Sequence, residues 1–93
     1  MSRTATREVP RHESHPEQWR RELVARNVVR AREEAGLSQL QLAEKLGVGR
    51  TQVSPWENAR KEPSTPSLLA IADVTGHGHD IGWFYTDHEA DDE

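Results

Sequence analysis

Residues 47–58 of the chain read GVGRTQVSPWEN, a segment with the pattern of a short amphipathic helix apart from one proline. Val53 and Trp56 are three positions apart, so a helix would place them on the same side, facing a core. Pro55 lies between them and cannot donate a backbone hydrogen bond to the carbonyl of Thr51. We therefore expect a kink or a loosened turn at this point, and the role of the segment depends on its neighbours.

The residues before this segment predict a second short helix, QLQLAEKL, at positions 39–46. Ser38, followed three positions later by Gln41, makes the capping-box pattern that opens a helix. Gly47 can take a positive φ, which suits a tight turn between the two helices. Two helices joined by so short a turn cross steeply and closely. The sequence thus predicts a compact two-helix unit over residues 39–58.

Three more helices are expected around this unit. A long helix with an apolar stripe is expected over residues 16–35, a fourth helix capped by Thr65, and a fifth short helix after Asp80. No stretch alternates apolar and polar residues with the period of a strand. The sequence therefore predicts an all-α, compact five-helix domain over residues 16–86.

Length and charge fit one small domain with two distinct ends. The chain has 93 residues and a net charge of −4, and the segment DHEADDE at 87–93 carries enough acid to account for that charge. Residues 1–15 are polar and aperiodic, which predicts a flexible N-terminal arm. With no cysteine and no long apolar run, the chain is expected to be a cytoplasmic protein that does not cross a membrane.

Each end of the chain allows two interpretations. The arginines of the N-terminal arm suit the minor groove of DNA, but the glutamates between them favour a tail that is only solvated. The acidic C-terminal tail either folds back over a basic surface or simply keeps the chain in solution.

The stretch GLSQLQLAEKLGVGRTQVSPWENARKEPS, residues 36–64, resembles the helix-turn-helix of the phage-repressor and Cro-like family of DNA-binding proteins. Several features carry the likeness: R-x-x-x-G-L-S-Q at 32–39, Leu-Ala at 42–43, Leu-Gly-Val at 46–48, Val53 with Trp56, and Glu-Asn at 57–58. The resemblance covers about residues 24–86. It implies a five-helix fold and a sequence-specific regulator that reads double-stranded DNA with its third helix, residues 50–58, in the major groove. A repressor of the phage-immunity type is the expected function.

Position by position, the resemblance implies three groups of DNA-contacting residues. Groove-facing side chains are expected at Arg50, Thr51, Ser54 and Pro55, with Gln52 at the edge of that face. Contacts to the DNA backbone are expected from Asn58, Arg60 and Lys61. Gln39, at the start of the second helix, is expected either to donate to a phosphate or to brace the first recognition residue.

The resemblance also bears on Pro55 and on the pair of Arg32 and Glu57. Relatives often carry a polar or basic side chain at the position of Pro55, so the chain departs from the family there. A proline ring can contact a thymine methyl group, or it contributes shape alone. Arg32 and Glu57 match a pair that forms a buried ion pair in this family, and their expected role is structural.

Other function classes have weaker support. A protein-interaction module of the same fold, such as an antitoxin subunit, is the second hypothesis, although the basic residues near the third helix favour DNA. No Ser/His/Asp or Cys/His arrangement, phosphate-binding glycine loop or carboxylate pair indicates an enzyme, and no cofactor or small-molecule ligand is expected. The histidines and aspartate at 77, 79, 80 and 88 lack metal-ligand spacing, so no metal site is expected.

A cluster of aromatic residues lies near the C-terminus. Trp83, Phe84 and Tyr85 are consecutive, so they cannot all face inward from one helix. Relatives often use this end of the domain as a dimer contact. The cluster therefore suggests a homodimer through the last helix.

Overall fold

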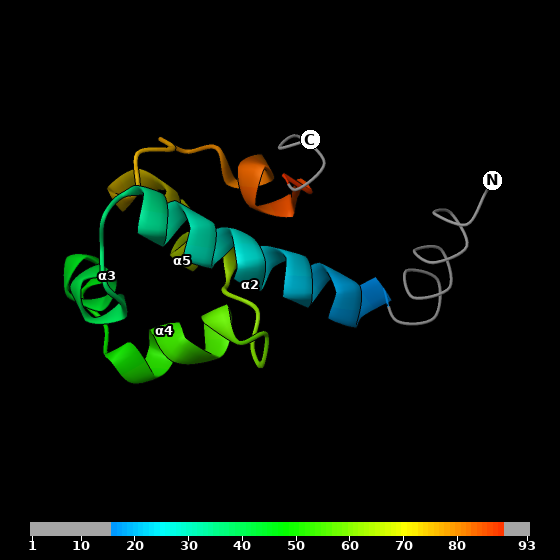
Figure 1. Cartoon of the computed structure of the whole chain (residues 1–93), viewed down its shortest axis with the longest axis horizontal. Helices are drawn as coiled ribbons and strands as arrows, with labels where there is room; N and C mark the ends of the chain where they lie inside the picture. Colours follow the sequence, from blue (N-terminus) through cyan, green and yellow to red (C-terminus); the bar gives the residue numbers. More distant parts are fainter. Residues whose placement is uncertain (1–15, 89–93) are drawn as a thin grey trace.

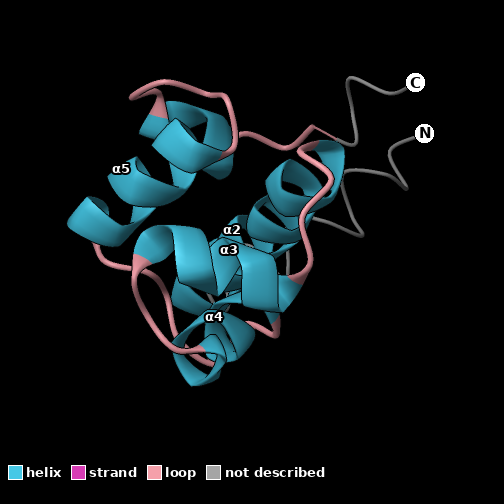
Figure 2. Cartoon of the chain, turned by 90° about the vertical axis from the view of Figure 1, so that its left-hand side faces the viewer, coloured by secondary structure: helices cyan, strands magenta, loops and turns pink. Residues whose placement is uncertain are grey.

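The computed structural model describes residues 16–88, which form four α-helices and one 3₁₀ helix (Figure 1). The elements are α2 (Pro16–Glu34), α3 (Gln39–Leu46), α4 (Arg50–Glu57), α5 (Thr65–Val74) and the 3₁₀ helix η1 (Ile81–Tyr85). Within this range the chain is helix and loop without a strand (Figure 2), which confirms the all-α class. The fifth element is a 3₁₀ helix of five residues, slightly longer than most runs of the tighter i→i+3 pattern.

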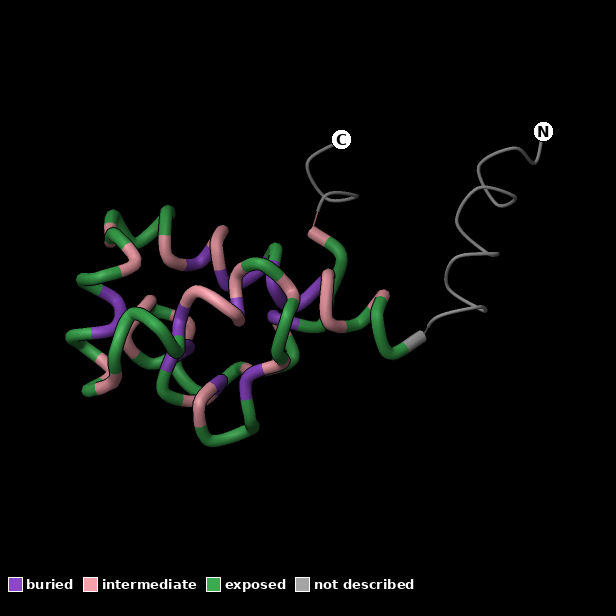
Figure 3. The backbone as a smooth tube through the Cα atoms, turned by 90° about the horizontal axis from the view of Figure 1, so that it is seen from below, coloured by how far each residue is buried: buried purple, intermediate pink, exposed green. Residues whose placement is uncertain are grey.

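The long helix α2 organises the other elements. It packs against α4 and against η1, while α5 packs against α3 and η1 (Figure 1). Buried positions recur along the helices between exposed ones (Figure 3). The core is built from apolar side chains of every element, chiefly Val24, Val28, Ala31, Leu42, Val53, Leu68, Ile71 and Phe84. Burial of these side chains, at about 25 cal/mol per Å² of apolar surface, is the main source of stability.

Helix boundaries follow the capping chemistry, with two corrections. The capping box at Ser38 is confirmed, since the backbone N–H of Gln41 donates to its hydroxyl oxygen at 3.0 Å. The long helix was expected to reach residue 35, but it ends at Glu34, and Ala35 is exposed. The cap of α5 is Ser64 and not Thr65, because the hydroxyl of Ser64 accepts from the backbone N–H of Ser67.

A buried asparagine holds η1 against α2. Asn27 is 2% exposed, and its amide nitrogen Nδ2 donates to the carbonyls of Phe84 at 2.9 Å and Thr86 at 2.8 Å. Asp80 caps the N-terminal end of η1, since the backbone N–H of Trp83 donates to its carboxylate. Together these bonds fix a short helix that could not persist alone.

The three consecutive aromatic residues of η1 have different surroundings. Phe84 is fully buried, so it cannot contact a second copy, and the expected dimer contact loses one of its three residues. Tyr85 is 38% exposed and Trp83 is half-buried. Trp83 lies against two histidine rings, with centroid distances of 4.0 Å to His77 and 4.3 Å to His88.

Some predictions concern segments that the structure does not describe. The N-terminal arm, residues 1–15, and residues 89–93 of the acidic tail lie outside the described residues. Across residues 16–88, no helix combines the length and the apolar character that crossing a bilayer requires. The same residues contain no group of three His, Cys, Asp or Glu side chains that could hold a metal ion.

Candidate nucleic-acid interface

The orientation of α4 follows from its two apolar anchors. Val53 and Trp56 are buried in the core, as their spacing predicted. The opposite side of the helix is polar and accessible, with exposed side chains at Arg50, Thr51 and Gln52 and half-buried ones at Ser54 and Pro55. A helix that is held from one side presents the other side as a continuous surface.

The turn before α4 brings its first residue to the surface. Gly47 has a φ of 74°, a left-handed conformation that glycine adopts without a steric penalty. Gly49 is the N-cap of α4 but has no side chain with which to cap it. Arg50 is therefore the first side chain of the helix, and it lies beside backbone N–H groups that carry partial positive charge. This end of the helix suits an anionic or electronegative partner.

Pro55 does not interrupt α4. The helix continues to Glu57, and the backbone N–H of Asn58 donates to the carbonyl of Ser54 at 3.0 Å. Proline removes only the bond that its own N–H would have made to the carbonyl of Thr51. The carbonyl oxygen of Pro55 also takes part in a hydrogen bond, since it accepts from the backbone N–H of Arg60 at 2.9 Å.

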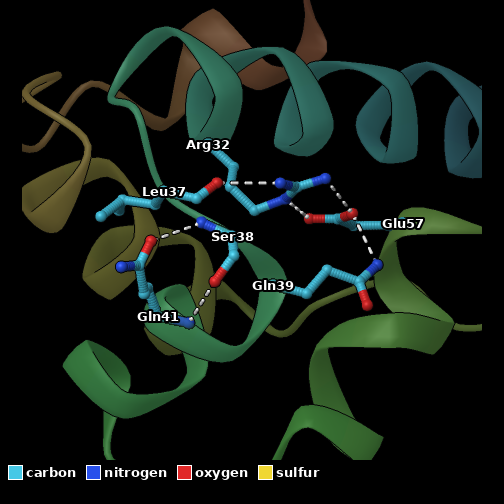
Figure 4. A network of polar contacts seen from close by, with 6 residues as sticks. All are labelled: Arg32, Leu37, Ser38, Gln39, Gln41 and Glu57. Atoms are coloured by element: carbon cyan, nitrogen blue, oxygen red, sulfur yellow. Dashed lines mark hydrogen bonds and ion pairs between the residues drawn. The ribbon is translucent and has the colours of Figure 1, made fainter.

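A polar network joins α2, α3 and α4 behind this surface (Figure 4). The Nε of Arg32 lies 2.7 Å from one carboxylate oxygen of Glu57, and its Nη2 lies 3.1 Å from the other. The two side chains are 14% and 5% exposed, so the expected buried ion pair is confirmed. The hydrogen bond to Glu57 raises the pKa of Arg32 above its ordinary value, against the opposite effect of burial.

Gln39 joins the same network. Its amide nitrogen Nε2 donates to the carboxylate of Glu57 at 2.8 Å (Figure 4). The structure thus ties Gln39 to the last residue of α4, whereas the sequence suggested a phosphate or the first recognition residue. This bond fixes the start of α3 relative to the end of α4.

The loop after α4 carries three exposed polar side chains, Asn58, Arg60 and Lys61. The side-chain oxygen of Asn58 accepts from the backbone N–H of Arg60 at 3.2 Å, which folds the loop back on the end of the helix. Two exposed cations therefore lie at the C-terminal end of α4. Phosphate groups are the partners that such exposed cations favour.

Residues far away in the sequence also hold this loop, and local patterns did not indicate them. The guanidinium of Arg21, in α2, donates to the carbonyl of Ala59 at 2.9 Å. Arg20 pairs with Glu62, which also accepts a hydrogen bond from the hydroxyl of Tyr85. These contacts join residues 23 to 42 positions apart, so only the folded structure reveals them.

Comparison with known proteins agrees with this geometry. The profile of the helix-turn-helix family matches residues 28–79, more than half of the chain. The chain belongs to the helix-turn-helix family. The match runs from the middle of α2 to the turn after α5, so it includes the whole of α3 and α4. Neither the curated proteins nor the solved structures offer a match.

Membership of the helix-turn-helix family, of the Cro and repressor-like type, makes the chain a DNA-binding regulator of transcription. In this architecture the second helix of the motif lies in the major groove of DNA, and here that helix is α4. The family is regulatory and is not typically enzymatic. The sequence resemblance is thus confirmed at the level of family and fold.

Proposed function

We propose that the chain is a sequence-specific repressor that reads duplex DNA with α4. The observation that carries this proposal is the polarity of α4. Its apolar side is fixed in the core by Val53 and Trp56, while Arg50, Thr51 and Gln52 at its start are exposed. A helix held in this way enters the major groove with its first residues against the base edges.

The side chains of α4 suit direct readout of base pairs. Arg50 is proposed to bond to O6 and N7 of a guanine, a bidentate contact worth about 1–3 kcal/mol of discrimination. Hydroxyl and amide groups at Thr51, Gln52 and Ser54 can donate to or accept from base edges or phosphates. Pro55 is proposed to place its ring against a thymine methyl group.

Contacts to phosphates supply affinity and register. Asn58, Arg60 and Lys61 are exposed at the end of α4, where the DNA backbone borders the groove. Gln39 has a second amide hydrogen besides the one bonded to Glu57, and this hydrogen is proposed to reach a phosphate. Such contacts do not depend on the base sequence, but they fix how the helix lies in the groove.

Repression needs only that the protein occupies a site that the transcription machinery requires. A domain of this size, placed on a bacterial or phage promoter in the cytoplasm, would block it by occupancy. Two copies that meet through the exposed parts of Trp83 and Tyr85 would bind a site with two-fold symmetry. The exposed tyrosine also favours the alternative of a protein-interaction module, in which η1 contacts a different protein.

Binding to a mixed-sequence duplex tests the DNA function without knowledge of the target site. We expect binding that weakens steeply with salt, because each neutralised phosphate adds about 0.9 to the slope of log K against log salt. Replacement of both Arg60 and Lys61 by alanine is expected to lower the slope by about 2. The control is Arg30→Ala, which removes one positive charge from α2 and leaves Arg60 and Lys61 in place. A folded chain that binds no duplex at low salt would contradict the proposal.

Transcription from a promoter that contains the bound sequence tests repression itself. Added protein is expected to lower the transcript yield in proportion to occupancy of the site. A higher yield would identify an activator.

A further inference from the structure

The loop between α4 and α5 is held by the first turns of α2, outside the part of the chain that the family profile matches. Figure 1 shows this loop passing close to α2. Arg21 donates from Nε to the carbonyl of Ala59 at 2.9 Å. Arg20 lies 3.1 Å from a carboxylate oxygen of Glu62. The helix therefore contacts both halves of the loop.

Ala59 has an unusual backbone conformation. Its φ is 65°, and among residues 16–88 it is the one non-glycine residue with a positive φ. An L-residue other than glycine seldom adopts the left-handed region, because its Cβ then comes too close to the following carbonyl oxygen. Such a conformation persists only where surrounding contacts impose it. The bond from Arg21 is a contact of this kind, since it joins the carbonyl of Ala59 itself.

The conformation of Ala59 decides where the next two residues lie. After this turn, the backbone N–H groups of Arg60 and Lys61 both reach the carbonyl of Pro55, at 2.9 and 3.2 Å. The two cations are thereby attached to the end of α4 and do not extend into solvent on a free loop. Their backbone positions thus depend on a turn that Arg21 supports.

A second contact fixes the far side of the loop. Glu62 accepts from Arg20 with one carboxylate oxygen and from the hydroxyl of Tyr85 with the other, each at 3.1 Å. Pro63, the next residue, is buried. The loop is therefore held on both sides of Arg60 and Lys61.

We propose that Arg21 is a positioning residue for DNA binding, which acts by holding Ala59 in its left-handed turn so that Arg60 and Lys61 are placed for phosphates before DNA arrives. This inference rests on the proposed function, because that proposal assigns the two cations to the DNA backbone. A loop that is already ordered avoids the entropy cost of ordering it on binding. Phosphate contacts carry no sequence information, so Arg21 should affect the affinity for every duplex equally.

Three variants separate positioning from simple charge. Arg21→Ala removes both the hydrogen bond and the charge. Arg21→Gln removes the charge but keeps a donor, because Nε2 of glutamine follows the same number of carbons as Nε of arginine. Arg30→Ala removes one charge from α2 without touching the loop, and it measures the general effect of charge on affinity. Urea unfolding of each variant confirms that it is folded.

Two measurements give the outcome: amide hydrogen exchange at Arg60 and Lys61 in the free protein, and affinity for a mixed-sequence duplex. We expect Arg21→Ala to speed exchange at both amides and to weaken binding about tenfold on every duplex. Arg21→Gln is expected to keep slow exchange and to bind as Arg30→Ala does. In the Arg21→Ala background, Ala59→Gly should restore slow exchange in part, because glycine adopts the left-handed turn freely.

Three outcomes overturn the inference. Unchanged exchange in Arg21→Ala would show that the turn does not need Arg21, whatever happens to DNA binding. If Arg21→Gln bound DNA as weakly as Arg21→Ala, the loss of affinity would come from the lost charge. Faster exchange with normal affinity would show that the turn at Ala59 does not contribute to DNA binding. By contrast, a wild-type chain that binds no duplex would remove the proposed function itself, so the two failures are distinguishable.

Discussion

Arg32 and Glu57 form an ion pair of 2.7 Å that joins the C-terminal part of α2 to the last residue of α4. Gln39 brings the start of α3 to the same carboxylate. The three helices around the proposed DNA surface therefore share one largely buried acid. Because α4 is only eight residues long, its orientation depends on such contacts and on its two apolar anchors.

Removal of one partner from this pair tests its structural role. Arg32→Ala leaves the carboxylate of Glu57 largely buried with Gln39 as its remaining side-chain donor, and we expect a loss of about 3 kcal/mol in the free energy of unfolding. Urea unfolding followed by circular dichroism measures this loss. The control is Arg30→Ala, whose exposed pair with Glu34 is worth below about 1 kcal/mol. Equal small losses in both variants would contradict a structural role.

The attachment of η1 to α2 gives a second prediction. Asn27→Ala leaves the carbonyls of Phe84 and Thr86 without their side-chain donor, and a loss of about 2 kcal/mol is expected. Denaturant unfolding measures the loss, and tryptophan fluorescence should report a changed environment of Trp83. Gln18→Ala, which removes an exposed hydrogen bond on the same helix, should change stability little. An unaltered stability of Asn27→Ala would mean that water satisfies both carbonyls.

The pH dependence of Tyr85 gives a third prediction. Burial, followed by the hydrogen bond to Glu62, raises the pKa of Tyr85 above its ordinary value of 10.0. The folded chain therefore keeps this proton at a pH where the unfolded chain loses it. The contribution to stability is complete below about pH 10 and is lost as the pH rises through the raised pKa.

The absorbance of tyrosinate measures this pKa directly, because Tyr85 is the sole tyrosine of the chain. The midpoint should lie higher in the folded protein than in denaturant. Glu62→Gln should lower it toward the ordinary value, since the negative acceptor is gone. If Glu62→Gln left the midpoint in place, the bond between Tyr85 and Glu62 would not form in solution.

What the sequence could predict depends on how local each signal is. The capping box needs only Ser38 and Gln41, and the inward pair needs only Val53 and Trp56, so both were predicted correctly. The prediction that Thr65 caps α5 was wrong, because adjacent Ser64 and Thr65 are both good caps and the structure uses Ser64.

Long-range contacts had no signal in the sequence. Asn27 bonds a carbonyl 57 residues away, and Arg21 bonds one 38 residues away. Each donor is a polar residue on a helix, with nothing in its neighbours to indicate an acceptor. The ion pair of Arg32 and Glu57 was predicted from the family resemblance, whereas the bond of Gln39 to Glu57 was not.

The role of Pro55 is the fourth prediction. If its ring contacts a thymine methyl group, Pro55→Ala should relax the preference for one base pair by about 1 kcal/mol and leave the other positions unchanged. Pro66→Ala, at an exposed position of α5, is the matched control. Competition between duplexes that differ at single base pairs measures the effect. An identical base-pair preference in wild type and Pro55→Ala would show that Pro55 affects only the shape of the helix.

Selection of binding sequences from a random duplex library tests the central claim most directly. We predict that the wild-type chain enriches one defined sequence, and that Arg50→Ala loses the preference at one of its positions. A palindrome with half-sites one helical turn apart would indicate two bound copies, and an asymmetric site would indicate one. If the folded wild-type chain enriched no sequence, readout of DNA by α4 would be contradicted.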